Sequence, residues 1–221
     1  VLAVGAPRED GFHEVHTIMH SLALHDSLTM RRFEEDTDVL DPENQGLSIV
    51  LKCETSGDIA PLEVPAEDNI AYRAVKELAQ ELGRSENETI HMSLSKVIPA
   101  EAGLGGGSSN AAAALLGAAT LWGIEPDDER LFKVASRLGA DVAFFLKGGC
   151  AYLSGKGEVF ETSLKPRKGF IVLVRPSVGV STGKAYAAFD ANPQYPDSDY
   201  LVQLSQKTDA AEVELWNNLA D

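Results

Sequence analysis

A run of glycines followed by two serines has the composition of a loop that binds phosphate. Four of the five residues at 103–107 are glycine, and the stretch 97–116 reads VIPAEAGLGGGSSNAAAALL. Glycines let the backbone adopt positive φ and come close to a ligand. The first N–H groups of a following helix lack partners, and the helix dipole adds partial positive charge there. We therefore predict an anion site, although a tight turn or a linker without a ligand would also use glycine.

The loop departs from the two commonest nucleotide-binding patterns. No Lys-Ser or Lys-Thr pair follows the last glycine, as the loop of nucleoside triphosphatases requires. Gly103, Gly105 and their neighbours fit the dinucleotide-binding fingerprint only loosely. The loop is therefore assigned to neither class.

Asp141 is the strongest single candidate for a residue that carries chemistry. It comes two residues after Gly139, at the end of an expected helix, and precedes the apolar run at 142–146. A carboxylate at a helix end, directly before a run of apolar residues, is not expected to be there for solubility alone. The same position also suits a cap in which the side chain binds nearby backbone N–H groups. The residues alone leave both interpretations open.

A turn near the start of the chain holds two candidate ligand-binding side chains. Asp10 and Gly11 form a strong turn pair, and Phe12 and His13 follow directly. A histidine after a turn is, however, more often a surface residue than a ligand.

The glycine loop must be held between a strand and a helix. Residues 89–97 alternate apolar and polar side chains, which is the period of a half-buried strand. Residues 111–116 are strong helix formers, and Ser108 and Ser109 stand where an N-cap belongs. We therefore expect the helix to begin at the two serines and to be closed by Gly123.

The remaining elements indicate the α+β class. A helix is expected at 70–82, where Asp68 or Asn69 can cap it and the apolar residues share one face. Another is expected at about 127–138, ending at Gly139. Further expected elements are strands at 1–4, 27–33, 47–53, 150–153, 158–162 and 170–174, a mostly extended segment at 12–24, helices at 182–189 and 201–219, and loops at 34–43 and 57–67. Strands first and then a mixture argue against a regular alternation.

Composition and charge restrict the class of protein. The chain has 221 residues, 44% of them hydrophobic, and a net charge of −15 with a pI near 4.7. An acidic chain is a poor general partner for nucleic acid or for an anionic membrane. Cys53 and Cys150 lie far apart, which favours two reduced thiols and a cytoplasmic location. No stretch has the length of a membrane span, and no signal peptide is recognisable at the start.

The glycine stretch resembles the central motif of the galactokinase, homoserine kinase, mevalonate kinase and phosphomevalonate kinase (GHMP) superfamily. The motif Pro-x-x-x-Gly-Leu-Gly-x-Gly/Ala-Ser-Ser is met by Pro99, Gly103, Leu104, Gly105, Gly107, Ser108 and Ser109. The resemblance implies that the loop wraps the phosphates of ATP, with Mg²⁺ bridging them and Ser108 facing the metal. The implied loop residues are Pro99, Ala100, Glu101, Ala102, Gly103, Leu104, Gly105, Gly106, Gly107, Ser108 and Ser109.

Two shorter motifs resemble one branch of this superfamily, the kinases that act on 4-diphosphocytidyl-2-C-methyl-D-erythritol. The segment GADVAFF at 139–145 is similar to the branch motif Gly-Ala-Asp-Val-Pro-Phe-Phe, with Ala143 in place of the proline. The segment GFH at 11–13 resembles the branch motif Gly-Tyr-His, with a phenyl ring in place of the phenol. The resemblance implies that Asp141 is the catalytic base, that Phe12 stacks on cytosine and that His13 binds the base.

The same branch implies roles for four more residues. The stretch 176–186 is similar to its Pro-x-x-x-x-Ser/Thr segment, so Tyr186 would supply the opposing ring and Thr182 would contact the substrate phosphates. Asn69 and Lys96 occupy positions that line the adenine pocket in this branch. The implied activity is ATP-dependent phosphorylation of the substrate 2-hydroxyl, in non-mevalonate isoprenoid synthesis. A GHMP kinase for homoserine, mevalonate or a sugar, or an inactive nucleotide-binding module, remain alternatives.

The resemblance also implies a fold and its division into domains. We expect the GHMP kinase fold, with an N-terminal domain of the ribosomal protein S5 domain 2-like type at 1–165 and the beginning of the C-terminal domain at 166–221. Family members carry an N-terminal Pro-Ala-Lys-x-Asn strand, whose lysine assists the catalytic Asp, and a C-terminal Thr/Ser-Gly-x-Gly motif; this sequence has neither. The expected partners are ATP and a cytidine diphosphate derivative, without nucleic acid or membrane, in a monomer or homodimer.

Overall fold

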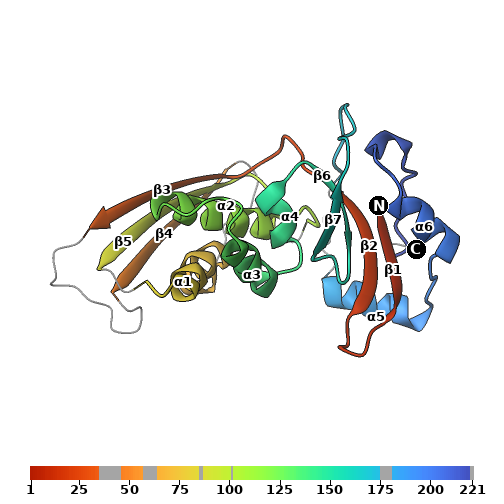
Figure 1. The fold of residues 1–221 in the computed structure, drawn as a ribbon, viewed down its shortest axis with the longest axis horizontal. Helices are drawn as coiled ribbons and strands as arrows, with labels where there is room; N and C mark the ends of the chain where they lie inside the picture. Colours follow the sequence, from red (N-terminus) through yellow and green to blue (C-terminus); the bar gives the residue numbers. More distant parts are fainter. Residues whose placement is uncertain (35–45, 57–63, 85–86, 101, 175–180, 220–221) are drawn as a thin grey trace. The chain divides into compact units, whose positions relative to one another are not determined.

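The structure, a computed structural model, describes residues 1–34, 46–56, 64–84, 87–100, 102–174 and 181–219. It has the expected α+β class (Figure 1). The strands are β1 Leu2–Pro7, β2 His13–His20, β3 Ser27–Glu34, β4 Leu47–Thr55, β5 Glu88–Lys96, β6 Cys150–Ser154 and β7 Val159–Ser163. The α-helices are α1 Ile70–Leu82, α2 Gly106–Leu121, α3 Glu129–Leu138, α4 Val142–Lys147, α5 Thr182–Ala191 and α6 Ser198–Ser205, with short 3₁₀ turns at Ala66–Asp68 and Ala210–Glu212. In the described part of the chain, no helix is long and apolar enough to cross a membrane.

The chain divides into two compact units. The first comprises Val1–Leu22 and Lys147–Asp221, and the second comprises Ala23–Leu146. The glycine loop and Asp141 belong to the second unit, whereas Phe12, His13 and Tyr186 belong to the first. The domain boundary expected at 165/166 divides the sequence at one point, whereas the first unit combines two separate segments. That boundary stays a prediction.

In the second unit, a three-stranded sheet carries the strand that leads into the glycine loop. Its order is β3-β5-β4, with β3 antiparallel and β4 parallel to the central β5. A parallel pair needs a crossover connection, and α1 lies in the crossover between β4 and β5. Helices α1, α2 and α3 gather beside this sheet (Figure 1), and Leu78, Leu115 and Leu131 are fully buried in their common core.

Helix α1 has the bounds that the sequence predicts, because both of its ends carry local signals. The side chain of Asn69 accepts a hydrogen bond from the backbone N of Ala71 at 2.9 Å. At the other end Gly83 has a φ of 64°, the left-handed conformation that closes many helices. Val75 and Leu78 are fully buried on the face that the apolar pattern predicts.

Helix α2 begins earlier than predicted. The sequence predicts a serine cap at Ser108 or Ser109, but the N-cap is Gly105, with a φ of 64°, and the helix starts at Gly106. Ser109 lies inside the first turn, where its hydroxyl donates to the carbonyl of Gly106 at 2.9 Å. The preference of serine for a cap position is overridden by a glycine that turns the backbone directly into the helix.

Two other expected elements are wrong. Residues 170–174 are apolar, yet they form no strand: Phe170, Val172 and Val174 are exposed, and no described residue pairs with the segment. A strand exists only where a neighbour pairs with its backbone groups, which an apolar run alone does not supply. The helix expected at 201–219 ends at Ser205, because Asp209 caps a new turn by accepting from Ala211 N at 2.9 Å.

Smaller differences occur at other segments. Helix α3 starts at Glu129, slightly later than expected, with Asp128 as its cap. The apolar segment at 142–146 is the short helix α4. Glu34, the first residue of the expected loop at 34–43, is the last residue of β3, and the rest of that loop and most of the expected loop at 57–67 lie outside the described residues.

The first unit contains an antiparallel sheet in the order β1-β2-β6-β7, together with α5 and α6. The buried side chain of Asn218 binds both backbone groups of Val4 in β1. Its Oδ1 accepts from Val4 N at 2.8 Å, and its Nδ2 donates to Val4 O at 2.8 Å. A residue near the end of the chain thereby holds the first strand.

Candidate functional site

A cavity of about 420 Å³ lies where β5 leads into α2, and the glycine loop forms most of its wall. The predicted residues that line it are Asn69, Lys96, Pro99, Ala100, Ala102, Gly103, Leu104, Gly105, Gly106, Gly107 and Ser108. Of the other predicted residues, Ser109 turns its hydroxyl to the backbone of Gly106, and Glu101 lies outside the described residues. Four lining residues were not predicted: Val64, Asp68, Ile70 and Asn110.

The start of α2 needs glycine for steric reasons. A Cβ on Gly105 would lie 2.8 Å from the ring of Phe145, and one on Gly106 would lie 2.9 Å from Ile98. No side chain caps this helix end. Gly106 and Gly107, the first residues of α2, therefore line the cavity without side chains. Their backbone N–H groups have no partner in the helix, an arrangement that suits an anion.

A buried ion pair lies beside this helix start. Lys96, which lines the cavity, donates from its Nζ to Oδ2 of Asp26, and both side chains are almost completely buried. The other carboxylate oxygen of Asp26 accepts from Val97 N at 2.6 Å and from Ile98 N at 2.7 Å. Burial alone would raise the pKa of Asp26, but the hydrogen bonds from Ile98, Lys96 and Val97 outweigh it and hold this pKa below its usual value.

Asp141 lies directly before α4. The amide of Phe145 donates to the carbonyl of Asp141 at 3.4 Å, and the ring of Phe145 lies against Gly105. One helical turn thus separates the carboxylate from a ring that touches the glycine loop. Burial raises the pKa of the Asp141 carboxyl.

The side chain of Asp141 does not act as a local cap. Within the described residues, its carboxylate forms no hydrogen bond or ion pair, whereas the cap interpretation requires bonds from neighbouring N–H groups. A half-buried carboxylate without a protein partner suits a group that acts on a ligand.

The second group of predicted residues lies in the first unit. The ring of His13 is buried between two acceptors, with Nδ1 2.9 Å from the carbonyl of Gly5 and Nε2 3.0 Å from Oδ1 of Asp190. The rings of Tyr186 and Phe189 lie 5.2 and 5.7 Å from the His13 ring, measured between centroids. The structure therefore brings His13 and Tyr186 together, as the sequence motifs imply.

Phe12 lies half-exposed at the tip of the turn. Its amide donates to Oδ1 of Asp10 at 3.1 Å, and the ammonium group of Lys156 stands 4.5 Å from its ring centroid. The predicted sandwich of a base between Phe12 and Tyr186 stays a prediction. Thr182, the first residue of α5, is exposed.

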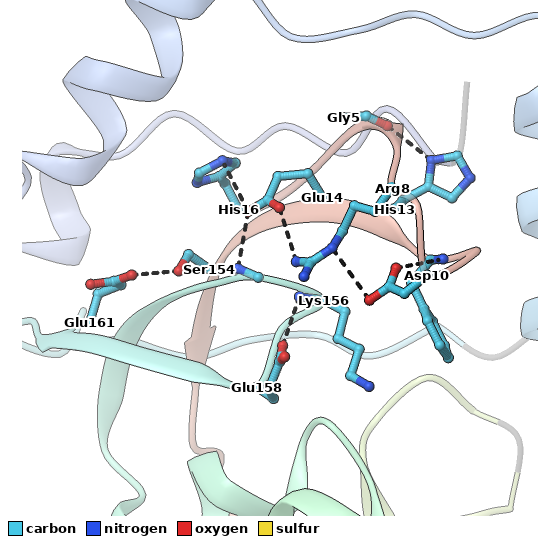
Figure 2. A network of polar contacts seen from close by, with 12 residues as sticks. Gly5, Arg8, Asp10, His13, Glu14, His16, Ser154, Lys156, Glu158 and Glu161 are labelled. Carbon is cyan, nitrogen blue, oxygen red and sulfur yellow. Dashed lines mark hydrogen bonds and ion pairs between the residues drawn. The ribbon is translucent and has the colours of Figure 1, made fainter.

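A polar network fixes this turn against the β6–β7 hairpin. Figure 2 shows Arg8 between Asp10 and Glu14, at 3.5 and 3.1 Å. The second oxygen of Glu14 accepts from Gly155 N, in the hairpin, at 3.2 Å. The hairpin carries Lys156, so the network places the Lys156 ammonium group beside Phe12.

Comparison with known proteins identifies the family. Residues 69–149 match the family model of the GHMP kinases N terminal domain. The chain is 36% identical to the 4-diphosphocytidyl-2-C-methyl-D-erythritol kinase of Pelotomaculum thermopropionicum, over 96% of this chain and 68% of that protein. The chain belongs to the 4-diphosphocytidyl-2-C-methyl-D-erythritol kinase family of GHMP kinases. The kinase of the same name from Desulfitobacterium hafniense is 35% identical, over 90% of this chain and 61% of its own length.

Solved structures support the fold of this family. A crystal structure of 4-(cytidine 5'-diphospho)-2C-methyl-D-erythritol kinase has a TM-score of 0.65 and 29% identity, covering 99% of this chain and 71% of that one. The homoserine kinase of Cytophaga hutchinsonii, at 20% identity and a TM-score of 0.53, shares the fold. The chain spans between 61% and 68% of the length of the two kinase-family relatives named above.

The sequence motifs missed several residues at or beside this cavity, and these differ in how easily they could be found from the sequence. Asn110 follows the last motif serine directly, so a motif longer by one residue would include it. Asp26 precedes its partner Lys96 by 70 residues and lies in no motif, so only the fold reveals it.

Proposed function

We propose that this chain carries the nucleotide and substrate sites of a kinase that transfers the γ-phosphate of ATP to the 2-hydroxyl of 4-diphosphocytidyl-2-C-methyl-D-erythritol. The names of the relatives support this substrate. The observation that carries the proposal is the glycine-walled cavity at the uncapped start of α2. Phosphoryl transfer depends mainly on positioning and on charge stabilisation, which such a site provides.

The loop would hold the phosphates through backbone groups. The N–H groups of Gly106, Gly107 and Ser108 begin α2, where the helix dipole favours negative charge. The glycines keep side chains away from these groups, and Asn69 and Lys96 would contact the adenosine part of ATP at the other wall of the cavity. The whole chain is acidic, so this local group of donors, and not the overall field, must attract the nucleotide.

Asp141 is the proposed general base. Burial raises the pKa of its carboxyl, which makes the carboxylate a stronger proton acceptor than an exposed one. It would accept the proton of the substrate 2-hydroxyl as that oxygen attacks phosphorus.

Mg²⁺ is the proposed metal, with Ser108 as its protein contact. When bound, the ion neutralises charge on the phosphates. The described residues contain no group of three or more His, Cys, Asp or Glu that could hold a metal. Mg²⁺ commonly takes few protein ligands and several oxygens from phosphates and water, so the Ser108 hydroxyl at the cavity wall fits that role.

The aromatic group in the first unit is the proposed cytidine site. His13 would bind the base, Phe12 and Tyr186 would stack on it, and Thr182 would contact the diphosphate. The carbonyl of Gly5 holds Nδ1 of the buried His13 ring in a defined orientation, and Nε2, which faces the exposed carboxylate of Asp190, would bind the base in place of that carboxylate. A cytoplasmic location is also proposed, because Cys53 and Cys150 are both free thiols.

Ligand-induced thermal stabilisation tests these assignments. We expect ADP and CDP each to raise the melting temperature of the full chain, because both bind the folded state. UDP and homoserine are the controls and should give smaller shifts than CDP. Equal shifts for CDP and UDP would contradict the cytidine site, and no shift with ADP would contradict the nucleotide site.

A further inference from the structure

Asp26 makes three contacts with the segment that enters the glycine loop, and no motif includes it. One carboxylate oxygen accepts a hydrogen bond from the ammonium group of Lys96. The other accepts hydrogen bonds from the N–H groups of Val97 and Ile98 at 2.6 and 2.7 Å. The Asp26 side chain is 2% exposed. One carboxylate therefore satisfies a buried cation and two backbone donors at the end of β5.

These contacts continue to the start of α2. Ile98 packs against Gly106, where a Cβ would lie only 2.9 Å from its side chain. The same Cβ position lies 3.7 Å from the Nζ of Lys96. Two of the three residues that Asp26 holds, Lys96 and Ile98, thus lie beside the first helical residue of α2.

Lys96 keeps donors for a ligand. An ammonium group has three N–H donors, and Asp26 is its one partner among the described residues. The side chain is 6% exposed and lines the cavity, so a ligand in the cavity can take the remaining donors. Without Asp26 the long lysine side chain would lose its anchor and a buried cation would lose its counter-charge.

We infer that Asp26 is a positioning residue for the nucleotide, which acts by orienting Lys96 and by fixing the Val97–Ile98 backbone ahead of the glycine loop. This inference rests on the proposed function, because it assumes that the cavity takes a nucleotide. It predicts that losing the carboxylate weakens nucleotide binding through Lys96 and leaves binding at the cytidine site unchanged.

The test measures ADP and CDP binding to the full chain by calorimetry. The variants are Asp26→Asn, Lys96→Met and the double variant, which replaces the pair without leaving an uncompensated charge. Asp26→Asn should weaken ADP binding roughly tenfold, the size expected for one lost charge-assisted hydrogen bond, and leave CDP binding unchanged. Because Asp26 acts through Lys96, adding Asp26→Asn to Lys96→Met should weaken ADP binding much less than it does alone.

The control variant is Glu54→Gln, which removes a carboxylate from the exposed pair with Lys52 in the same unit. It should leave ADP binding unchanged. Equal ADP affinities for Asp26→Asn and the unaltered chain would overturn the inference and leave the nucleotide site standing. A purely structural role, shown by equal losses of ADP and CDP binding or by additive effects of Asp26→Asn and Lys96→Met, would also overturn it. An unaltered chain that does not bind ADP would overturn both the inference and the proposed function.

Discussion

A buried carboxylate without a partner lowers the stability of the fold that contains it. Asp141 is a half-buried example, since burial raises its pKa above 3.8 and no described group stabilises its charge. The unfolded chain ionises this group at lower pH than the folded chain does. Above the pKa of the folded state, the ionised carboxylate therefore lowers the free energy of unfolding. This destabilisation disappears as the pH falls below 3.8, where the group is protonated in both states.

Asp141→Asn should consequently lower activity and raise stability. We expect turnover by the full chain, measured with ATP and the cytidine substrate, to fall about 10²- to 10⁴-fold. The melting temperature at pH 7 should rise, because the amide carries no charge to bury, and the gain should shrink in acid. A lower melting temperature for the variant at pH 7 would show that the carboxylate has a stabilising partner.

The start of helix α2 is the element on which the nucleotide site depends. Gly105 has a φ of 64° and a hypothetical Cβ would lie 2.8 and 2.9 Å from two carbons of the Phe145 ring. A rigid aromatic ring cannot move aside as a flexible side chain can. The loop and α4 therefore fit together only when this position has no side chain.

Gly105→Ala should reduce both stability and nucleotide binding. The left-handed conformation alone costs an alanine about 1–2 kcal/mol, and the contact with the ring adds to that. ADP affinity and the melting temperature of the variant should both fall. The matched control is Gly183→Ala in α5, where no atom lies within 4 Å of the new Cβ; its stability should stay the same or rise slightly. Unchanged ADP affinity in Gly105→Ala would show that nucleotide binding does not depend on the conformation of the loop at this residue.

The elements that could be predicted from the sequence are those with local signals. The bounds of α1 follow from Asn69 and Gly83, and the core of β5 follows from its alternation. The early start of α2 could not be predicted, because a serine cap and a left-handed glycine are both plausible until the loop is packed against Phe145 and Ile98. The strand predicted at 170–174 is wrong, because a strand needs a neighbour that pairs with its backbone and an apolar run alone does not supply one.

The candidate site likewise contains residues that could be predicted from the sequence and residues that could not. The cavity wall is the glycine motif, so most of its residues could be named from the sequence. The pair of Asp26 and Lys96 could not, because 70 residues separate its members and only the pairing of β3 with β5 brings their segments together.

At the scale of the whole molecule, one carboxamide near the end of the chain holds the first strand. Asn218 satisfies the N–H and C=O groups of Val4 and also donates to Gln194 O at 2.8 Å. Asn218→Ala should lower the free energy of unfolding by roughly 2–4 kcal/mol, because it leaves two buried backbone groups unpaired.

Hydrogen exchange can locate this effect. Amide exchange should accelerate in β1 and β2, within the first unit, and change little in α1 and α2 of the second. Asn192→Ala, at an exposed asparagine that ends α5, is the control and should leave the exchange of β1 unchanged. Equal acceleration in both units would mean that they open together.

The first unit is discontinuous in sequence, and this has a consequence for synthesis on the ribosome. Val1–Leu22 emerges before the second unit, but its sheet partner β6 follows only after the whole of Ala23–Leu146 has been translated. The second unit can therefore acquire its structure during translation before β6 is available. Until then β1 and β2 can form only an isolated hairpin, which is marginally stable in water. Asn218 follows the second unit in the sequence, so its hydrogen bonds to Val4 can form only after that unit has been translated.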